Sequence, residues 1–430
     1  MVNAPAGRYM QSKPIGVDLF AGAGGLSLGF ELAGFNVAAA VEYDPVHAAT
    51  HEFNFPGCAT ICRSVAETDG TYIRERSGIG KHDIDVVFGG PPCQGFSMIG
   101  KRALDDPRNS LVYHFVRLVA ELKPKYFVFE NVRGLTLGEH RKFLQEIMAE
   151  FGVHGYKVRD AYKVLNAANF GVPQDRQRLF LIGARKGRSL PLYPEPSHAV
   201  PGSSMALDFV KTTPTVWDAI GDLPEADEYE ELLKRDWTEA RFREPSEFAT
   251  PLRGAAVAPN RELLTSSMRT VHTELSKVRF KATAHGGIEP VSRFLKLDPV
   301  GVCNTLRAGT ASDHGAFTSP RPIHPFSPRC ITVREAARLH SYPDWFRFHV
   351  TKWHGFRQVG NSVPPLLGRA VASQIAAGVG ADASDGLGHR VGDPRLLAMN
   401  MSQAADYYGV SATVIPQRIR KTPSDVEQYA

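Results

Sequence analysis

Cysteine is scarce in this chain of 430 residues. The five cysteines are Cys58, Cys62, Cys93, Cys303 and Cys330. A small, odd number of cysteines in so long a chain argues against a disulfide framework and favours a reducing compartment. A cysteine at a functional position is therefore predicted to be a free thiol.

Long apolar runs and a strong excess of one charge are also absent. The N-terminal stretch MVNAPAGRYMQSKP lacks the apolar centre of a signal peptide, and no apolar run approaches the roughly 20 residues of a membrane span. We therefore expect a soluble, cytoplasmic protein without membrane contacts. The formal net charge of +5 is compatible with a polyanionic partner but is too small to identify one.

Between about Pro14 and Arg185, short apolar segments alternate with helical ones. The strand-like segments are IGVDLF, NVAAAVEY, IDVVFGG, KYFVFENV and LFLIGA, and helical stretches include residues 26–32 and 110–122. This alternation predicts an α/β fold with a mixed, mostly parallel sheet. Ligands of such sheets bind at the carboxyl ends of the strands.

The pattern changes after residue 185. Residues 186–325 mix prolines, glycines and charged patches without a βαβ rhythm, which predicts a second, smaller domain with long loops. Residues 326–380 return to helical patterns, with Thr332 and Glu335 spaced as a capping box. Residues 381–430 are polar and poor in aromatics, so we expect an appended tail that is partly disordered.

A glycine loop follows the first apolar segment. Gly22, Gly24 and Gly25 come between that strand and a helix, so a ligand could approach the backbone at a helix N-terminus. The next glycine is Gly29, which does not give the spacing of dinucleotide folds and favours a nucleoside cofactor without a pyrophosphate. A tight turn without a ligand is the alternative. Glu42, at the end of the second strand, supports the cofactor because a carboxylate can accept hydrogen bonds from both ribose hydroxyls.

A second group of polar residues follows three further strands. Cys93 comes after GGPP, which predicts a stiff, exposed loop suited to a nucleophile, whereas an isolated cysteine is otherwise usually a small buried hydrophobe. Glu130 lies at the end of another strand, and Arg176 and Arg178 precede the last one. A surface carboxylate and a solvated arginine face are the alternatives. In a parallel sheet, however, these groups would converge on one crevice with the glycine loop.

Six motifs in this sequence resemble those of the cytosine-5 DNA methyltransferases, in the family's order and with similar spacing. They are DLFAGAGGLSLGF, GGPPCQGFS, FENV, QDRQR, RCITVREAARLHSYPDWF and QVGNSVPP. The resemblance covers roughly residues 14–185 and 325–375. It implies a Rossmann-like methyltransferase domain at 10–185, a target recognition domain at 186–325, and a hinge and helix at 326–380 that return to the first domain before the tail at 381–430.

The resemblance also implies a reaction. S-Adenosylmethionine would be the cofactor, S-adenosylhomocysteine its product, and no metal would be needed. A cytosine flipped from duplex DNA would be attacked at C6 by Cys93, which makes C5 able to accept the methyl group. Glu130 would hydrogen-bond N3 and the exocyclic amine, and Arg178 would lie against O2. Arg176 would position the loop and contact a backbone phosphate.

Further residues are carried over from the family by position. The expected cofactor residues are Phe20, Gly24, Gly25, Leu26, Glu42, Tyr43, Ser64, Val65, Pro92, Leu111, Asn361 and Val363. Ser64 stands where the family usually has an adenine-binding aspartate, a loss on the order of 1 kcal/mol, and nearby Asp69 has the wrong spacing. The expected DNA contacts are Gln94, Ser97 and Arg307; for Arg307, a surface loop that touches only phosphates or nothing is the alternative.

Two other functions share this catalytic core. A tRNA cytosine-5 methyltransferase is disfavoured because ENVRGLTLGEHRKF lacks the Cys-Phe-Thr signature of that branch. A silent DNA-binding module would have no need for Cys93. We therefore expect a monomeric DNA (cytosine-5-)-methyltransferase of prokaryotic or phage origin, solitary or paired with a separately encoded restriction endonuclease, whose target sequence cannot be read from the chain.

Overall fold

A mixed sheet organises the N-terminal half of the chain. The computed structural model describes residues 13–92, 110–138, 140–159, 162–203, 210–254, 263–309, 321–383 and 390–414. Within these residues the sheet has strands β1 (Ile15–Leu19), β2 (Asn36–Glu42), β3 (Ala59–Cys62), β4 (Val86–Gly89), β5 (Tyr126–Val132), β6 (Tyr156–Val158), β7 (Lys163–Asn166) and β8 (Gln177–Arg185). The predicted strands at 15–20, 36–43, 84–90, 125–132 and 179–184 are confirmed.

The strand order is β3-β2-β1-β4-β5-β8-β6, and β7 pairs with β8. Strands β1 to β5 run parallel to their neighbours, whereas β8 is antiparallel to β5, β6 and β7. The parallel strands are buried on both faces, which explains their continuous apolar sequences. The predicted mixed, mostly parallel sheet is confirmed.

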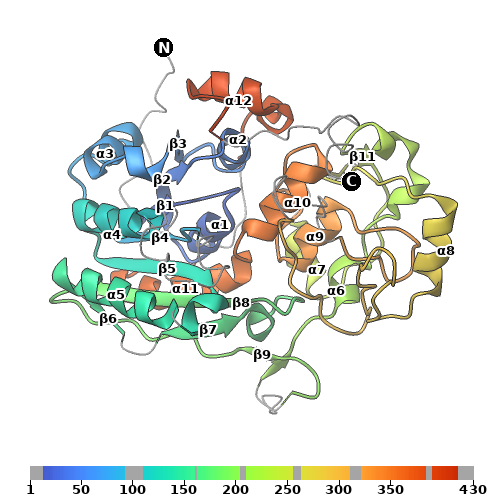
Figure 1. Cartoon of the computed structure of the whole chain (residues 1–430), viewed down its shortest axis with the longest axis horizontal. Helices are drawn as coiled ribbons and strands as arrows, with labels where there is room; N and C mark the ends of the chain where they lie inside the picture. The colour runs from blue at the N-terminus through green and yellow to red at the C-terminus, as the bar shows by residue number, and fades with distance from the viewer. Residues whose placement is uncertain are drawn as a thin grey trace, which may run out of the picture.

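Helices cover both faces of this sheet (Figure 1). Helices α3 (Gly70–Ser77), α4 (Ser110–Leu122) and α5 (His140–Val153) share one apolar cluster with one face. Helices α1 (Gly25–Leu32) and α11 (Pro365–Val379) share another cluster with the opposite face. Helix α2 (Pro45–Asn54) lies beside β2 and β3.

Helix α11 packs directly against α1 across some 340 residues of sequence. A Cβ atom added to Gly29 would lie only 2.7 Å from the backbone carbon of Gly368, so the two helices meet through their glycines. This close crossing brings the last helix back to the first strand-helix unit. Helices from the two ends of the family-like sequence therefore pack against each other.

Helices α6 (Val216–Ile220), α7 (Ala249–Arg253), α8 (Glu274–Ala282), α9 (Val333–Leu339) and α10 (Lys352–Asn361) gather beside the sheet, to its right in Figure 1. The chain after β8 also forms the short strands β9 (His198–Ala199), β10 (Lys211–Thr212), β11 (Thr238–Glu239) and β12 (Leu263–Leu264). The predicted capping box at Thr332 and Glu335 is confirmed. The largest apolar cluster continues from the sheet into α6 and α9, so these elements share a core with the first domain.

The C-terminal segment departs from the expected disorder. Residues 390–414 contain a 3₁₀ helix at Pro394–Ala398 and helix α12 (Met401–Tyr408), and both pack against α2 (Figure 1). Composition alone did not reveal this packing, because the partner helix is some 350 residues distant. Within the described ranges, no helix is both long and apolar enough to cross a membrane.

Candidate active site

The glycine loop after β1 is shaped by close packing. Gly24 has φ 102°, and a Cβ atom there would overlap the ring of Phe55. Only glycine satisfies both conditions. Phe20, the residue after β1, also has a positive φ of 64°, a strained conformation for a bulky side chain of the kind found at functional sites. The loop thus has a fixed shape at the carboxyl end of β1.

The last motif of the sequence closes this loop from the other side. A Cβ atom on Gly25 would collide with the carbonyl oxygen of Val363 and lie 2.6 Å from the hydroxyl of Tyr342. Val363 is buried and Asn361, at the end of α10, is exposed. The structure therefore brings Gly25 and Val363 together, as expected for two parts of one pocket.

Glu42 ends β2 beside the glycine loop. Its Oε2 accepts a hydrogen bond from the backbone N–H of Gly22 at 2.7 Å, and its Oε1 accepts one from the N–H of Asp44 at 2.8 Å. Desolvation by burial raises the pKa of this carboxyl, against the opposing field of His47. The two backbone donors orient the carboxylate at the strand end, where ribose hydroxyls were expected.

A buried polar network behind the loop was not anticipated from the sequence. The Ser27 hydroxyl donates to Oδ2 of Asp18 at 2.6 Å and lies 3.0 Å from Nε2 of His51. Burial raises the pKa of Asp18 to about 8 and lowers the pKa of His51 to about 3. These groups join β1, α1 and α2 behind the glycine loop. The only sequence signal was a carboxylate inside the apolar strand IGVDLF.

The loop after β3 has no acidic side chain at the expected adenine position. The Ser64 hydroxyl accepts a hydrogen bond from the N–H of Ala66 at 3.2 Å and caps a 3₁₀ turn, while Val65 is buried. Asp69 caps α3 by accepting from the N–H of Tyr72 at 2.8 Å. Asp69 thus uses one carboxylate oxygen to cap α3.

Glu130 and Arg178 form an ion pair at the antiparallel junction of β5 and β8. Nε of Arg178 lies 3.0 Å from Oε1 of Glu130, and both side chains are mostly buried. Desolvation raises the pKa of Glu130, although Arg178 and Arg176 oppose that shift. The carboxyl therefore holds a proton more readily than an exposed glutamate does.

The strand that leads to Cys93 is held against this pair. The Asn131 side-chain amide donates to the carbonyl of Pro91 at 3.0 Å, and a Cβ atom on Gly90 would collide with Oε2 of Glu130. Glycine at position 90 thus allows the Glu130 carboxylate to lie against the backbone. Cys93, Gln94 and Ser97 fall outside the described residues, which resume in α4 and include the partly buried Leu111.

Arg176 is not where a phosphate contact would need it. Its side chain is fully buried, and its guanidinium donates to the carbonyls of Leu306, Gly360 and Ser362 at 2.7 to 2.8 Å. Since no part of the side chain reaches the surface, this geometry disfavours the expected contact with a DNA phosphate. Arg176 instead ties β8 to two distant loops.

Arg307 directly follows Leu306, whose backbone carbonyl accepts a hydrogen bond from Arg176. Its side chain is exposed, and its backbone packs against Gly360 of α10. Gln174 fixes the same segment by accepting the N–H of Leu306 at 3.1 Å while donating to the carbonyl of Leu339 at 3.2 Å. The structure thus places Arg307 beside the loop that bears Arg176, although its position says nothing about base contacts.

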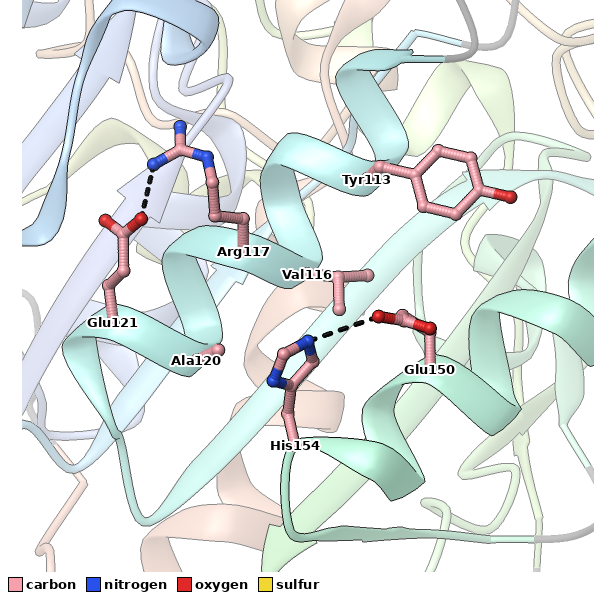
Figure 2. A pocket seen from close by; sticks show the side chains of 7 residues that line it. All are labelled: Tyr113, Val116, Arg117, Ala120, Glu121, Glu150 and His154. Atoms are coloured by element: carbon pink, nitrogen blue, oxygen red, sulfur yellow. Dashed lines mark hydrogen bonds and ion pairs between the residues drawn. The ribbon is translucent and has the colours of Figure 1, made fainter.

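A separate cavity of about 320 Å³ lies between α4 and α5 (Figure 2). Its residues are Tyr113, Val116, Arg117, Ala120, Glu121, Glu150 and His154. The ion pairs Arg117–Glu121 at 2.6 Å and His154–Glu150 at 3.2 Å rim it. No candidate site residue lines this cavity, so it is distinct from the crevice at the strand ends.

Comparison with known proteins assigns the family. A model described as C-5 cytosine-specific DNA methylase matches residues 16–377, a range that contains both halves of the crevice. The chain belongs to the C-5 cytosine-specific DNA methylase family. It is therefore a DNA (cytosine-5-)-methyltransferase, and the expectation from the sequence motifs is confirmed.

Several members of the C-5 cytosine-specific DNA methylases are similar over most of their length. Type II methyltransferase M.XorII of Xanthomonas oryzae pv. oryzae is 59% identical over 421 residues, which cover 95% of this chain and 96% of the relative. Type II methyltransferase M.AgeI of Thalassovita gelatinovora is 33% identical, with 84% of this chain and 99% of the relative covered.

Solved structures show the same fold. An E. coli prophage-encoded protein described as a DNA modification methyltransferase has a TM-score of 0.68 and 33% identity, with 85% of this chain and 99% of that chain covered. The S. pombe Dnmt2 methyltransferase has a TM-score of 0.53 at 16% identity, with 85% and 99% covered, and shows likeness of fold alone.

Proposed function

We propose that this enzyme methylates C5 of a cytosine flipped out of a specific duplex DNA sequence, through a covalent adduct between Cys93 and C6. The observation that carries the proposal is the Glu130–Arg178 pair, held against the Gly90–Pro91 backbone that leads directly to Cys93. A base that entered this crevice would meet the thiol, the carboxyl and the guanidinium together. Extrusion from the helix is needed because the faces of C5 and C6 are covered in stacked DNA.

The residues divide the reaction between them. The Cys93 thiolate adds to C6, the C5–C6 double bond opens, and the negative charge moves toward N3 and O2. Glu130, with its raised pKa, supplies a proton to N3, and Arg178 faces O2. C5 then accepts the methyl group, and S-adenosylhomocysteine is left. The C5 proton is lost to water, expulsion of the thiolate restores the C5–C6 double bond, and N3 returns its proton to the Glu130 carboxylate, so atoms and charges balance.

The crevice fits S-adenosylmethionine as the methyl donor. When bound, this cofactor supplies a methyl group activated by its sulfonium. The cradle at Gly24 and Gly25 leaves no room for side chains, and Glu42 presents an oriented carboxylate at the end of β2. We propose that the rest of the cofactor pocket is lined by Phe20, Leu26, Tyr43, Ser64, Val65, Pro92, Leu111, Asn361 and Val363.

We assign residues 10–185 and the helix within 326–380 to catalysis and 186–325 to target recognition, with Gln94, Ser97 and Arg307 toward DNA. The similarity to Type II methyltransferases supports a role in a restriction-modification system, with a separately encoded endonuclease that cuts the unmethylated site. The protein would then act as a monomer in the cytoplasm.

Bisulfite sequencing of unmethylated plasmid tests the proposal. The plasmid is incubated with S-adenosylmethionine and either the native protein or Cys93→Ser. We expect protected cytosines in one recurring sequence with the native protein and none with the variant. Protection by Cys93→Ser at the native rate would refute the nucleophile assignment. If folded native protein protects no cytosine, action on DNA is refuted, and tRNA is the substrate to test next.

The adduct can be tested apart from turnover. In DNA that carries 5-fluorocytosine at the target, fluorine replaces the proton that must leave C5, so the enzyme remains attached after methyl transfer. We expect a complex stable in denaturing gels for the native protein and not for Cys93→Ser, with equal DNA binding by both. Absence of the complex despite methylation of normal DNA would contradict a covalent route.

A further inference from the structure

The segment 390–414, here called the C-terminal strap, lies outside the family-matched region, which ends at residue 377. Even so, it is built onto the methyltransferase domain. Leu396 and Leu397 are buried and form one apolar cluster with Ala49 and Phe53 of α2. The strap therefore packs at a defined position on α2, the helix that follows Glu42 and Tyr43 in the sequence.

Two adjacent tyrosines fix the strap to a single carboxylate of α2. The hydroxyl of Tyr407 donates to Oε1 of Glu52 at 2.7 Å, and the hydroxyl of Tyr408 donates to Oε2 at 2.7 Å. Both oxygens of the carboxylate are thus engaged by neighbouring residues of α12, which fixes its orientation as a single contact would not. The backbone N–H of Gly392 adds a bond to the carbonyl of Phe53 at 2.7 Å.

The end of the strap reaches the cofactor side of the sheet. The Tyr43 hydroxyl donates to the carbonyl of Val414 at 2.6 Å. Tyr43 directly follows Glu42, whose carboxylate is held by Gly22 and Asp44. The ring of Tyr43 is 43% exposed, so its own packing does not fix its orientation, and the bond to the strap restrains it.

The same side of the site lacks the family's usual acid. Ser64 stands in the aligned position and carries no carboxylate, whereas Asp69 caps α3 through Oδ1 and has the wrong spacing for that position. A cofactor site without that contact depends more on the shape of its remaining walls. Tyr43 is the wall residue that the strap contacts.

We propose that the C-terminal strap positions Tyr43 as the adenine-side wall of the cofactor site and so offsets the missing acid at position 64. This inference rests on the proposed function, because it assumes that S-adenosylmethionine binds at Glu42. The alignment with M.XorII covers 95% of the chain and so extends past residue 377, where the family match ends.

The first test measures binding of S-adenosylhomocysteine by calorimetry to full-length variants. We expect Tyr43→Phe and the double variant Tyr407→Phe/Tyr408→Phe each to weaken binding about 3- to 10-fold, the range that loss of one hydrogen bond gives. All three hydroxyls act through one strap. The triple variant Tyr43→Phe/Tyr407→Phe/Tyr408→Phe should therefore bind S-adenosylhomocysteine no more weakly than the double variant. Tyr113→Phe, at a tyrosine of similar exposure (41%) on α4, is the matched control and should bind normally.

The second test uses reciprocity between sites. If the strap favours cofactor binding, the cofactor must stabilise the strap by the same factor. We expect S-adenosylhomocysteine to slow amide hydrogen exchange in peptides from 401–414 of the native protein and not in Tyr43→Phe. The variants should also raise KM for S-adenosylmethionine more than they lower kcat.

The outcomes separate the two proposals. Native affinity in Tyr43→Phe and in the double variant, with unchanged exchange of the strap, would overturn the strap's role and leave the proposed function intact. Failure of the folded native protein to bind S-adenosylhomocysteine at all would instead overturn the assigned cofactor site and the strap's role together. Additive losses in the triple variant would contradict a single path through Tyr43.

Discussion

Nε of Arg178 lies 3.0 Å from Oε1 of Glu130. The protein itself makes this arrangement, since the antiparallel pairing of β5 with β8 sets the separation of the two groups. Such preorganisation avoids reorienting polar groups during the reaction. A cytosine that enters must share the carboxyl with Arg178.

Glu130→Gln tests the proton at N3. The amide keeps the size of the side chain but cannot transfer a proton, so we expect methyl transfer in single turnover to fall by about 10²- to 10⁴-fold. Binding of S-adenosylhomocysteine should stay within a factor of two of native. A rate close to native would show that Glu130 does not act on the base, and weaker cofactor binding would place it in another role.

The raised pKa of Glu130 also predicts a pH effect. Because burial stabilises the protonated form, the acid needed at N3 persists to higher pH than for an exposed glutamate and is lost as pH rises through the raised value. The rate should therefore fall as the pH rises through that raised value. Single-turnover rates of Glu130→Gln, measured across pH, should not show this fall. A pH profile identical to that of the native protein would contradict the assignment.

Arg176→Lys should destabilise the fold. An ammonium group cannot reach the three carbonyls of Leu306, Gly360 and Ser362, so buried acceptors lose their donors, at a cost of about 2–4 kcal/mol. Urea unfolding measures the change. Arg188→Lys, at an exposed position, is the control and should stay within about 0.5 kcal/mol of native. If both substitutions change the unfolding free energy equally, Arg176 does not stabilise the fold by linking these loops.

Gly29→Ala should force α1 and α11 apart. The new methyl group would meet the backbone of Gly368, which cannot move as a flexible side chain does, at a cost of about 1–3 kcal/mol. In α5, by contrast, a Cβ atom on Gly152 meets nothing within 4 Å, and Gly152→Ala should stabilise by about 0.5–1 kcal/mol. Thermal unfolding distinguishes these opposite signs, and a neutral Gly29→Ala would show that the helices can separate without loss.

Glu335 predicts a dependence of stability on acid pH. Burial alone would raise its pKa, but the bidentate Arg329 and the N–H of Thr332 bring it down to about 2. The stabilisation is complete above the ordinary value near 4.5 and is lost as the pH falls toward 2. We expect Glu335→Gln to lower the unfolding free energy by about 3 kcal/mol at pH 7. The deficit should shrink below about pH 4.5; a deficit that stays constant to pH 3 would contradict this account.

The fold and the candidate residues at the strand ends could be predicted from the sequence for one physical reason. Strands buried on both faces are apolar throughout, so polar residues such as Glu42 and Glu130 stand out where each strand ends. The same local pattern did not reveal the burial of Arg176, because alternating arginines look alike whether they face water or three carbonyls. Its partners lie 130 to 186 positions away.

The buried groups behind the site were harder still to predict. Asp18 was visible as one acid in an apolar strand, but its partners Ser27 and His51 come from separate helices. Residues 381–430 as a whole were expected to be partly disordered because their composition is polar, and no pattern set residues 390–414 apart. What orders the strap is a distant acid, Glu52, together with two leucines that by themselves form no recognisable pattern.

The contact between α1 and α11 has a consequence for synthesis of the enzyme. Gly25 leaves the ribosome early, whereas Val363 and Gly368, which complete its surroundings, are among the last parts of the domain to be made. A nascent chain cannot close its cofactor pocket until translation has passed them. Modification of DNA therefore requires chains that have been synthesised past Gly368, and a frameshift just before that residue should abolish it as completely as an early one.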